Sequence, residues 1–433
     1  MKQLFADNKQ LLLIGSIWII FGIYTGPLVY IVLPIMLLLM NKREMHLEIL
    51  LGFFLILTLS DSRSHSLSFA ANIKNIYILL ISLFSYMQIK NLNQKIDFYK
   101  YFIPFFLVAL ICIFFNPNMF LSAQKVLSYI LLFCFVPNYV WFVYQKYGDT
   151  FIRSVIFLVC VILVLGIVFN FFKSDLTILA GRYRGLLGNP NGLGLYVFLF
   201  LVFFSISSDD NPELLTRGQK VIVYLLCFYS LLKCGARTSL VSTLLFFFFK
   251  RFYKISPIVG FFIFIATAFV YNLISDNMTE IITSLGLGEE LRVSTIENGS
   301  GREVAWQFAW QQINENFFLG KGFSYTEYIY RKNYEYLSLL GHEGAAHNSY
   351  LTLWLDVGLI GLVLFLGGLL ITFLKAAKLN RAAIPILYAV LFSNQYESWL
   401  TASLNPFTIQ LIFVISFIFI KDLLKDEKLA INC

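Results

Sequence analysis

Five residues of this sequence have side chains suited to chemistry, and each lies in or next to a polar segment between apolar runs. Guanidinium groups bind phosphate oxygens through paired hydrogen bonds. An imidazole accepts a proton readily near neutral pH. Four arginines are therefore candidates for binding an anionic oxygen cluster, and one histidine is a candidate base. In chain order these residues are Arg182, Arg184, Arg237, Arg302 and His347.

The histidine closes a polar segment, residues 275–347, at the point where the next apolar run begins. One interpretation makes His347 a general base at a membrane interface. The alternative makes it an interfacial histidine beside a helix start that Asn348 or Ser349 caps. His342 lies five positions earlier with no acidic cluster around it, which does not match a metal site. The sequence predicts no bound metal.

The arginines also allow two interpretations each. Arg182 and Arg184 stand among glycines before an Asn189-Pro190-Asn191 turn, which suits phosphate binding but equally suits contact with lipid headgroups. Arg237 lies between two short apolar runs. An arginine at membrane depth faces a partner or a wet cavity, or else extends to the headgroups.

Arg302 opens an amphipathic segment that runs to about Asn316. Its apolar residues recur at intervals of three and four, which predicts a helix with one apolar face. We expect this face to lie on the bilayer or to pack on the helix bundle. The residues that form it are Trp306, Ala309, Trp310 and Ile313.

These residues must be positioned by an almost wholly apolar chain. Of its 433 residues 58% are hydrophobic and 13% charged, and the mean hydropathy is +0.74. The apolar runs approach the length that crosses a bilayer, which predicts an all-α, polytopic transmembrane bundle with one large extracytoplasmic loop that contains amphipathic helices. About fourteen spans are predicted, at residues 10–24, 27–40, 47–60, 76–89, 99–115, 125–144, 152–172, 191–207, 220–233, 238–249, 255–274, 349–374, 383–400 and 405–421.

The net charge of +8 sits in short loops and not in a cluster, so the sequence predicts no nucleic-acid partner. By the positive-inside rule, the Lys- and Arg-rich loops and both termini are cytoplasmic. The loop 275–347 and all five site residues then fall on the outer face. The six cysteines have neither metal nor disulfide spacing and are expected to be small buried hydrophobes.

Three segments in order around this loop resemble the O-antigen ligase/polymerase superfamily. Two supporting stretches are similar as well, from Asn316 to Phe323 and from Asp356 to Gly361. The resemblance covers roughly Tyr183 to Leu370. Its three main segments are Gly235-Ala236-Arg237-Thr238-Ser239, Ser300-Gly301-Arg302-Glu303-Val304-Ala305-Trp306 and His347-Asn348-Ser349-Tyr350-Leu351.

The resemblance implies an integral-membrane glycosyltransferase of the bacterial inner (plasma) membrane, active on the periplasmic face. Such enzymes transfer a glycan from undecaprenyl diphosphate to an acceptor hydroxyl. The implied roles are diphosphate binding for Arg237 and Arg302, joined by Arg182 and Arg184, and proton abstraction for His347. The implied chemistry is inverting and uses neither metal nor cofactor. Residues 1–172 would then be N-terminal spans, and residues 173–433 the catalytic region.

Within the family we favour a polymerase, whose acceptor is another lipid-linked repeat unit. Its partners would be undecaprenyl-diphosphate-linked glycan, membrane lipids and a chain-length regulator. The close alternative is an O-antigen ligase, whose acceptor is lipid A-core. A protein O-oligosaccharyltransferase fits less well, because no added C-terminal domain is expected. A lipid-linked-sugar flippase also fits less well, because transporters commonly show internal repeats and charges inside many spans.

Overall fold

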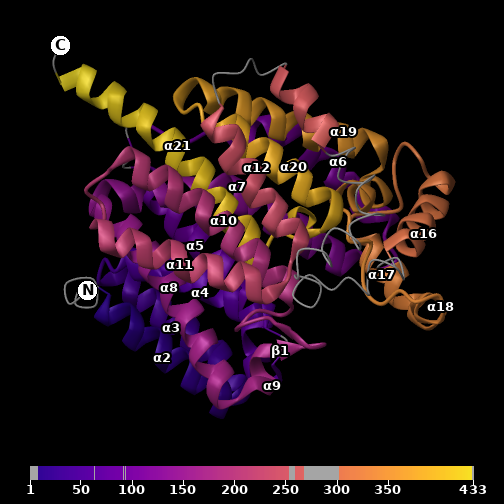
Figure 1. The fold of residues 1–433 in the computed structure, drawn as a ribbon, viewed down its shortest axis with the longest axis horizontal. Helices are drawn as coiled ribbons and strands as arrows, with labels where there is room; N and C mark the ends of the chain where they lie inside the picture. The colour runs from indigo at the N-terminus through magenta and orange to yellow at the C-terminus, as the bar shows by residue number, and fades with distance from the viewer. Residues whose placement is uncertain are drawn as a thin grey trace, which may run out of the picture. The chain divides into compact units, whose positions relative to one another are not determined.

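The computed structural model describes residues 8–62, 64–90, 92, 94–252, 259–267 and 302–431, without the side chains of 27 and 425–431. Within these ranges the chain is nearly all helical (Figure 1). Seven helical segments are long and apolar enough to cross a membrane, which confirms an all-α, multi-pass membrane protein. They are His65–Ile89, Phe98–Phe115, Met119–Tyr147, Asp149–Phe172, Pro190–Asp210, Ser349–Leu379 and Pro406–Leu424.

The predicted spans coincide with helices wherever the structure describes them, but many of these helices are short. Seven described segments reach the length of a full span, against about fourteen predicted. Lys9–Tyr24, at 1.5 Å per residue, extends only about 24 Å. The predicted span 255–274 and the loop residues 275–301 lie largely outside the described residues.

The chain forms two compact units that interleave along the sequence. The first comprises Met1–Asp97, Leu131–Ala236 and Leu404–Cys433. Its helices and strands are α2 (Lys9–Tyr24), η1 (Gly26–Leu28), α3 (Val29–Lys42), α4 (His46–Asp61), η2 (His65–Leu67), α5 (Ser68–Ile89), most of α7 (Met119–Tyr147), α8 (Asp149–Phe172), α9 (Ser174–Thr177), β1 (Ile178–Leu179), β2 (Arg182–Tyr183), α10 (Pro190–Asp210), α11 (Arg217–Cys234) and α21 (Pro406–Ile431).

Contacts between loops of the first unit agree with the side of the membrane that the sequence predicts for each loop. At one end, Lys146 Nζ lies 2.6 Å from Glu44 Oε2, and Lys421 pairs with Asp210. At the other end, the Gly188 amide donates to Asp61 Oδ2 at 2.9 Å. The loops assigned to one side by their basic residues therefore meet one another. The compartment that each side faces stays a prediction.

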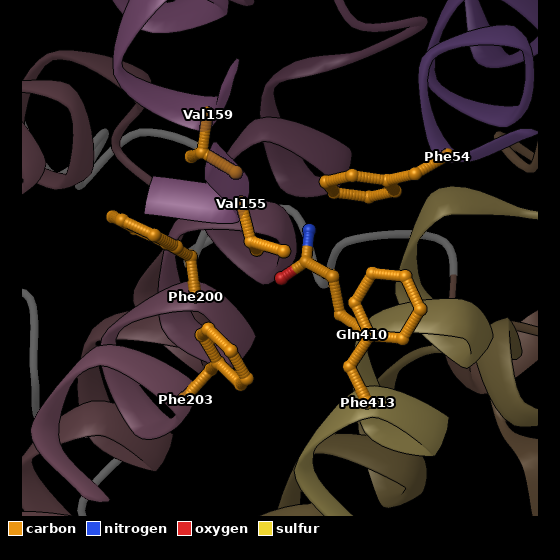
Figure 2. Close-up of a pocket in the computed structure, with 7 residues that line it drawn as sticks. All are labelled: Phe54, Val155, Val159, Phe200, Phe203, Gln410 and Phe413. Atoms are coloured by element: carbon orange, nitrogen blue, oxygen red, sulfur yellow. The ribbon is translucent and has the colours of Figure 1, made fainter. Parts of the chain in front are cut away.

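The first unit contains a small cavity of about 10 Å³, enough for about one water molecule (Figure 2). The carboxamide of Gln410 on α21 is buried there, and neither its oxygen nor its nitrogen has a hydrogen-bond partner among the described residues. The other lining side chains are apolar, so the cavity is a packing defect and not a candidate active site. They are Phe54, Val155, Val159, Phe200, Phe203 and Phe413.

The second unit comprises Phe98–Ile130 and Arg237–Ser403. Its helix α16 packs against α19, and α12 and α19 both pack against α20. Its elements are η3 (Phe98–Phe102), α6 (Ile103–Cys112), η4 (Ile113–Phe115), the start of α7, α12 (Arg237–Arg251), α16 (Arg302–Glu315), α17 (Tyr325–Lys332), α18 (Tyr334–Leu339), α19 (Ser349–Leu379), α20 (Ala383–Tyr396) and η5 (Trp399–Thr401).

Helix α19 is broken at Gly358, where φ is 70° and ψ is 178°. The segment 316–322 fills the break. The amides of Leu359 and Ile360 donate to the carbonyls of Phe317 and Phe318, at 2.9 and 3.3 Å. A Cβ at residue 358 would lie 2.1 Å from the Phe318 oxygen, so only glycine fits. The two supporting stretches of the sequence resemblance are thus packed against each other.

Asp356, just before the break, fixes the start of α17. Its buried carboxylate accepts hydrogen bonds from the amides of Ser324 and Thr326, both at 2.8 Å, and from the Thr326 hydroxyl at 2.7 Å. A carboxylate in this position satisfies helix N-terminal amides that would otherwise lack partners. The segment between α16 and α19 is therefore tied to the membrane helix at two adjacent points.

Candidate functional site

His347 occupies a strained turn at the start of α19. Its φ of 47° lies in the left-handed region, which costs on the order of 1–3 kcal/mol for a residue other than glycine. Hydrogen bonds on both sides hold the turn: Trp306 Nε1 donates to the Ala346 carbonyl at 2.9 Å, and the Asn348 amide donates to Ser398 Oγ at 2.9 Å. The imidazole is therefore presented from a backbone conformation that its neighbours impose.

The Nε2 side of the imidazole is bordered by a glycine. Gly344 has a φ of 123°, and a Cβ added there would lie 3.2 Å from His347 Nε2. The absence of a side chain at this position leaves Nε2 approachable. The side chain of His347 is 35% exposed, so an acceptor group can reach it.

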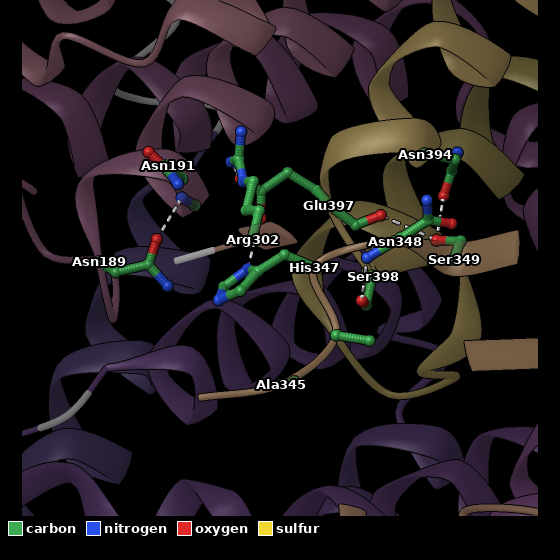
Figure 3. A network of polar contacts seen from close by, with 12 residues as sticks. Asn189, Asn191, Arg302, Ala345, His347, Asn348, Ser349, Asn394, Glu397 and Ser398 are labelled. Carbon is green, nitrogen blue, oxygen red and sulfur yellow. Dashed lines mark hydrogen bonds and ion pairs between the residues drawn. The ribbon is translucent and has the colours of Figure 1, made fainter. Parts of the chain in front are cut away.

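Asn348 and Ser349 anchor the first turn of α19, as the capping alternative predicts. Asn348 Oδ1 accepts from the amides of Tyr350 and Leu351, at 2.9 and 3.0 Å. Ser349 Oγ donates to Asn394 Oδ1 at 2.5 Å and contacts the Glu397 carbonyl at 2.9 Å (Figure 3). This cap leaves the imidazole of His347 outside the helix and available for other contacts.

Glu397, just after α20, joins two of the predicted site residues (Figure 3). Its Oε1 accepts from Arg302 Nη2 at 3.0 Å, and its Oε2 lies 3.5 Å from His347 Nδ1. Its side chain is 10% exposed, so water screens these contacts weakly. A carboxylate at Nδ1 favours the tautomer with its proton on Nδ1, which leaves Nε2 as the basic nitrogen. The arrangement can therefore orient a base beside a guanidinium.

Arg302 is held by its helix and by an aromatic ring as well. Its Cζ lies 5.8 Å from the centroid of the Tyr396 ring. One guanidinium nitrogen contacts Glu397, and the group carries five N–H donors in all. The remaining donors can serve an anionic ligand.

The apolar face of α16 packs inside the second unit, which is one of its two predicted positions. Ala305, Ala309 and Ile313 are buried, whereas Trp310 is partly exposed. Tyr330 of α17 donates to the Ala305 carbonyl at 2.5 Å, and burial raises the pKa of this phenol, so it remains a donor. Packing of this face fixes the direction of α16 and hence of Arg302.

Arg237 begins α12, which runs along α20. The rings of Phe249 and Tyr388 lie 5.0 Å apart, and Val241 packs in the same apolar cluster as Tyr396. Both helices contribute to this cluster, and Arg237 lies one turn before Val241 on α12.

Arg182 and Arg184 lie in the first unit, and their guanidinium groups contact backbone carbonyls. Arg182 donates to the carbonyls of Cys234, at 2.8 and 3.1 Å, and of Gly235, at 2.9 Å. Arg184 is buried, and its Nη1 donates to the Gly188 carbonyl at 3.4 Å. Arg182 thereby fixes the C-terminal end of α11, directly before Arg237. Whether either arginine also binds a diphosphate stays a prediction.

His342 lies closer to the site than its sequence position suggested. It is buried, and its ring meets that of His347 edge to face, with 6.0 Å between centroids. Glu397 was missed altogether by the sequence reasoning. Its signal was an acidic residue between the apolar runs 383–396 and 406–420, where a charge is costly and usually functional.

Comparison with known proteins bears on this site directly. Residues 222–366, about a third of the chain, match the family model described as O-antigen ligase. The matched region contains Arg237, Arg302 and His347, and excludes Arg182, Arg184 and Glu397. A search of curated proteins found no match to the chain. The family match confirms the resemblance that the sequence motifs indicated.

Proposed function

Because residues 222–366 belong to the O-antigen ligase family, within the O-antigen ligase/polymerase superfamily, we propose that this chain is an inverting glycosyltransferase. It transfers a glycan from undecaprenyl diphosphate to an acceptor hydroxyl, at the periplasmic face of the bacterial inner membrane. The observation that carries this proposal is Glu397, which contacts both Arg302 and His347.

Arg302 and Arg237 bind the diphosphate of the donor in this proposal. Breaking the bond between sugar and diphosphate places negative charge on a leaving group that stays attached to the lipid. Guanidinium groups bind such oxygens in pairs and stabilise the growing charge. The packing of α12, which begins with Arg237, against α20, which ends directly before Glu397, supports convergence of Arg237 with Arg302. Arg182 contributes by holding the turn before Arg237, and Arg184 belongs to the same loop.

His347 removes the proton of the acceptor hydroxyl. The hydroxyl approaches Nε2 past Gly344, its oxygen attacks the anomeric carbon, and the bond to the diphosphate oxygen breaks as the proton moves to Nε2. Glu397 keeps Nδ1 protonated before the step and stabilises the imidazolium afterwards. Attack from the face opposite the diphosphate inverts the anomeric centre. No step in this sequence requires a metal.

We favour a polymerase, with a second lipid-linked repeat unit as acceptor and a chain-length regulator as partner. This choice rests on the sequence alone. The ligase alternative keeps the same donor chemistry and replaces the acceptor by lipid A-core, so the two differ only in what approaches His347.

The test uses the full-length protein in nanodiscs with undecaprenyl-diphosphate-linked repeat units. We expect longer lipid-linked glycans without any other acceptor, whereas a ligase would form product only when lipid A-core is added. His347→Ala should lower the rate by roughly 10²–10⁴-fold while donor binding persists. His65→Ala removes an exposed histidine of the first unit and should have no effect.

The buried His342 is unsuitable as a control because its ring packs on His347. Transfer at a normal rate by the His347→Ala protein would move the base to another residue. No transfer to either acceptor by the wild-type protein, with donor binding intact, would remove the glycosyltransferase assignment.

A further inference from the structure

Several backbone groups of the segment 316–322 hydrogen-bond to α19 and α6, although the segment lies outside any helix. Besides the two bonds at the break of α19, the amides of Lys321 and Gly322 donate to the carbonyls of Leu355 and Asp356, both at 2.9 Å. Cys112 Sγ of α6 lies 3.4 Å from the Leu319 carbonyl. Irregular backbone is tolerated at membrane depth where protein partners its polar groups, and these bonds supply part of that requirement.

The position of the break along α19 gives the depth of this segment. Lys375 is the first charged residue after Asp356 on this helix, and it marks the far edge of the apolar span. A hydrocarbon core of about 30 Å takes about 20 helical residues, which reach back from Lys375 to Leu355. The amides at residues 359 and 360, and the segment bonded to them, then lie about 6 Å inside the hydrocarbon core.

The exposed side chains at the tip of this segment are apolar, whereas Asn316 at its start is exposed and polar. Phe318 is 62% exposed, and Leu319 is exposed beside it. They continue the exposed apolar faces of α6 and α19, to which their backbone is bonded. The charged group of Lys321 turns back to α16, where it contacts Gln312 at 3.0 Å and pairs with Glu315. The flanking members of this surface are Ile111, Phe114, Ile360 and Val363.

We propose that residues 316–322 form a re-entrant membrane segment whose tip, Phe318-Leu319, contacts the acyl chains of the surrounding lipids. A segment assigned by sequence to the polar outer loop thus belongs to the membrane-embedded surface of the protein. The inference depends on the chain being a membrane protein and is independent of the reaction proposed above. Acyl chains are the occupant that the depth, the apolar tip and the exposed apolar faces of α6 and α19 indicate.

Site-directed spin labelling tests the position of the tip. Phe318→Cys is made in the full-length protein with its native cysteines replaced, labelled with a nitroxide and placed in nanodiscs. We expect high collision rates with oxygen and low rates with a water-soluble nickel chelate, as for a label at Val363→Cys on α19. A label that behaves like one at Tyr336→Cys on α18 would overturn the proposal. A label that is shielded from both reagents and shows dipolar coupling to the label of a second copy would also overturn the proposal, because a second protein molecule would then cover the tip.

A charge substitution provides a second measurement without removal of the cysteines. Phe318→Asp and Tyr336→Asp alter aromatic residues of similar exposure, 62% and 58%. A carboxylate at membrane depth is destabilising, whereas one in water is not. We expect the apparent Tm in nanodiscs to fall for Phe318→Asp and to stay near wild type for Tyr336→Asp. Equal, small changes in both proteins would contradict a membrane position.

Discussion

At the scale of single residues, Glu397 links one of the predicted arginines, Arg302, to the predicted histidine, His347. Its carboxylate contacts both Arg302 and His347, and in the proposed reaction it balances one positive charge and orients the base. General bases in many enzymes are oriented by a third group in this manner. The three side chains come from α16, from the turn before α19 and from the end of α20, so each depends on a different element.

We expect Glu397→Gln to lower kcat on the order of 10²-fold, because the amide keeps the size of the side chain but loses the charge that favours the Nδ1-protonated tautomer. The KM for the donor should change less. Steady-state transfer assays measure both constants. Glu343→Gln, an exposed acidic residue four positions before His347, serves as the control. Loss of activity in the control alone would assign the orienting role to Glu343.

Arg302→Lys should weaken donor binding by roughly 10–100-fold, because lysine keeps the charge but not the paired donors of the guanidinium. The measurement is the Kd for undecaprenyl-diphosphate glycan in detergent or nanodiscs. Arg331→Lys alters an exposed arginine of α17 and should leave the Kd unchanged. An equal Kd for both variants would mean that Arg302 supports Glu397 and does not contact the donor.

At the scale of elements, the break in α19 is what connects the membrane span to the segment that carries Arg302. A continuous helix would satisfy its own amides and leave residues 316–322 without partners. The break turns these groups toward the segment, and Asp356 adds the start of α17. The position of α16 over the site is therefore tied to the geometry of one glycine.

Gly358→Ala should destabilise the protein by about 3 kcal/mol or more, because alanine is disfavoured at this φ and its Cβ would meet the Phe318 oxygen. Gly367→Ala is the matched control in the same helix, where an added Cβ meets nothing within 4 Å. That change should be neutral or stabilise by about 0.5–1 kcal/mol. Apparent Tm in nanodiscs compares the two. Equal stability would show that the break tolerates a side chain.

At the scale of the whole molecule, the distribution of basic residues predicts that the segment 302–347 faces the outside. Within the first unit, contacts between loops at the helix ends agree with the predicted assignment of successive loops to opposite sides of the membrane. The predicted orientation rests on this assignment. Membrane-embedded charge is costly, so each charged loop is confined to one face once the spans are inserted.

Cysteine labelling of intact cells tests this orientation. A cysteine at the exposed Glu335 should react with an impermeant maleimide, whereas one at the exposed Arg43 should react only after permeabilisation. The buried native cysteines Cys112, Cys227 and Cys234 should contribute little background. The reverse pattern would place the site in the cytoplasm and contradict a periplasmic reaction.

The sequence alone determined that the chain is an all-α membrane protein, because apolar runs of this length have no other stable arrangement in a bilayer. Short motifs around Arg237, Arg302 and His347 also indicated the resemblance that the family model matching residues 222–366 supports. These features are local, since they depend on residue type and on spacing within a few turns of helix.

Tertiary structure decided which residues meet. Glu397 follows His347 by 50 positions and Arg302 by 95, and no periodicity connects them. Likewise the break at Gly358 and its pairing with residues 316–322 depend on backbone groups that sequence patterns do not reveal. A buried carboxylate and a broken helix each require partners from elsewhere in the chain, because unsatisfied polar groups are costly in an apolar interior. Only the fold supplies those partners.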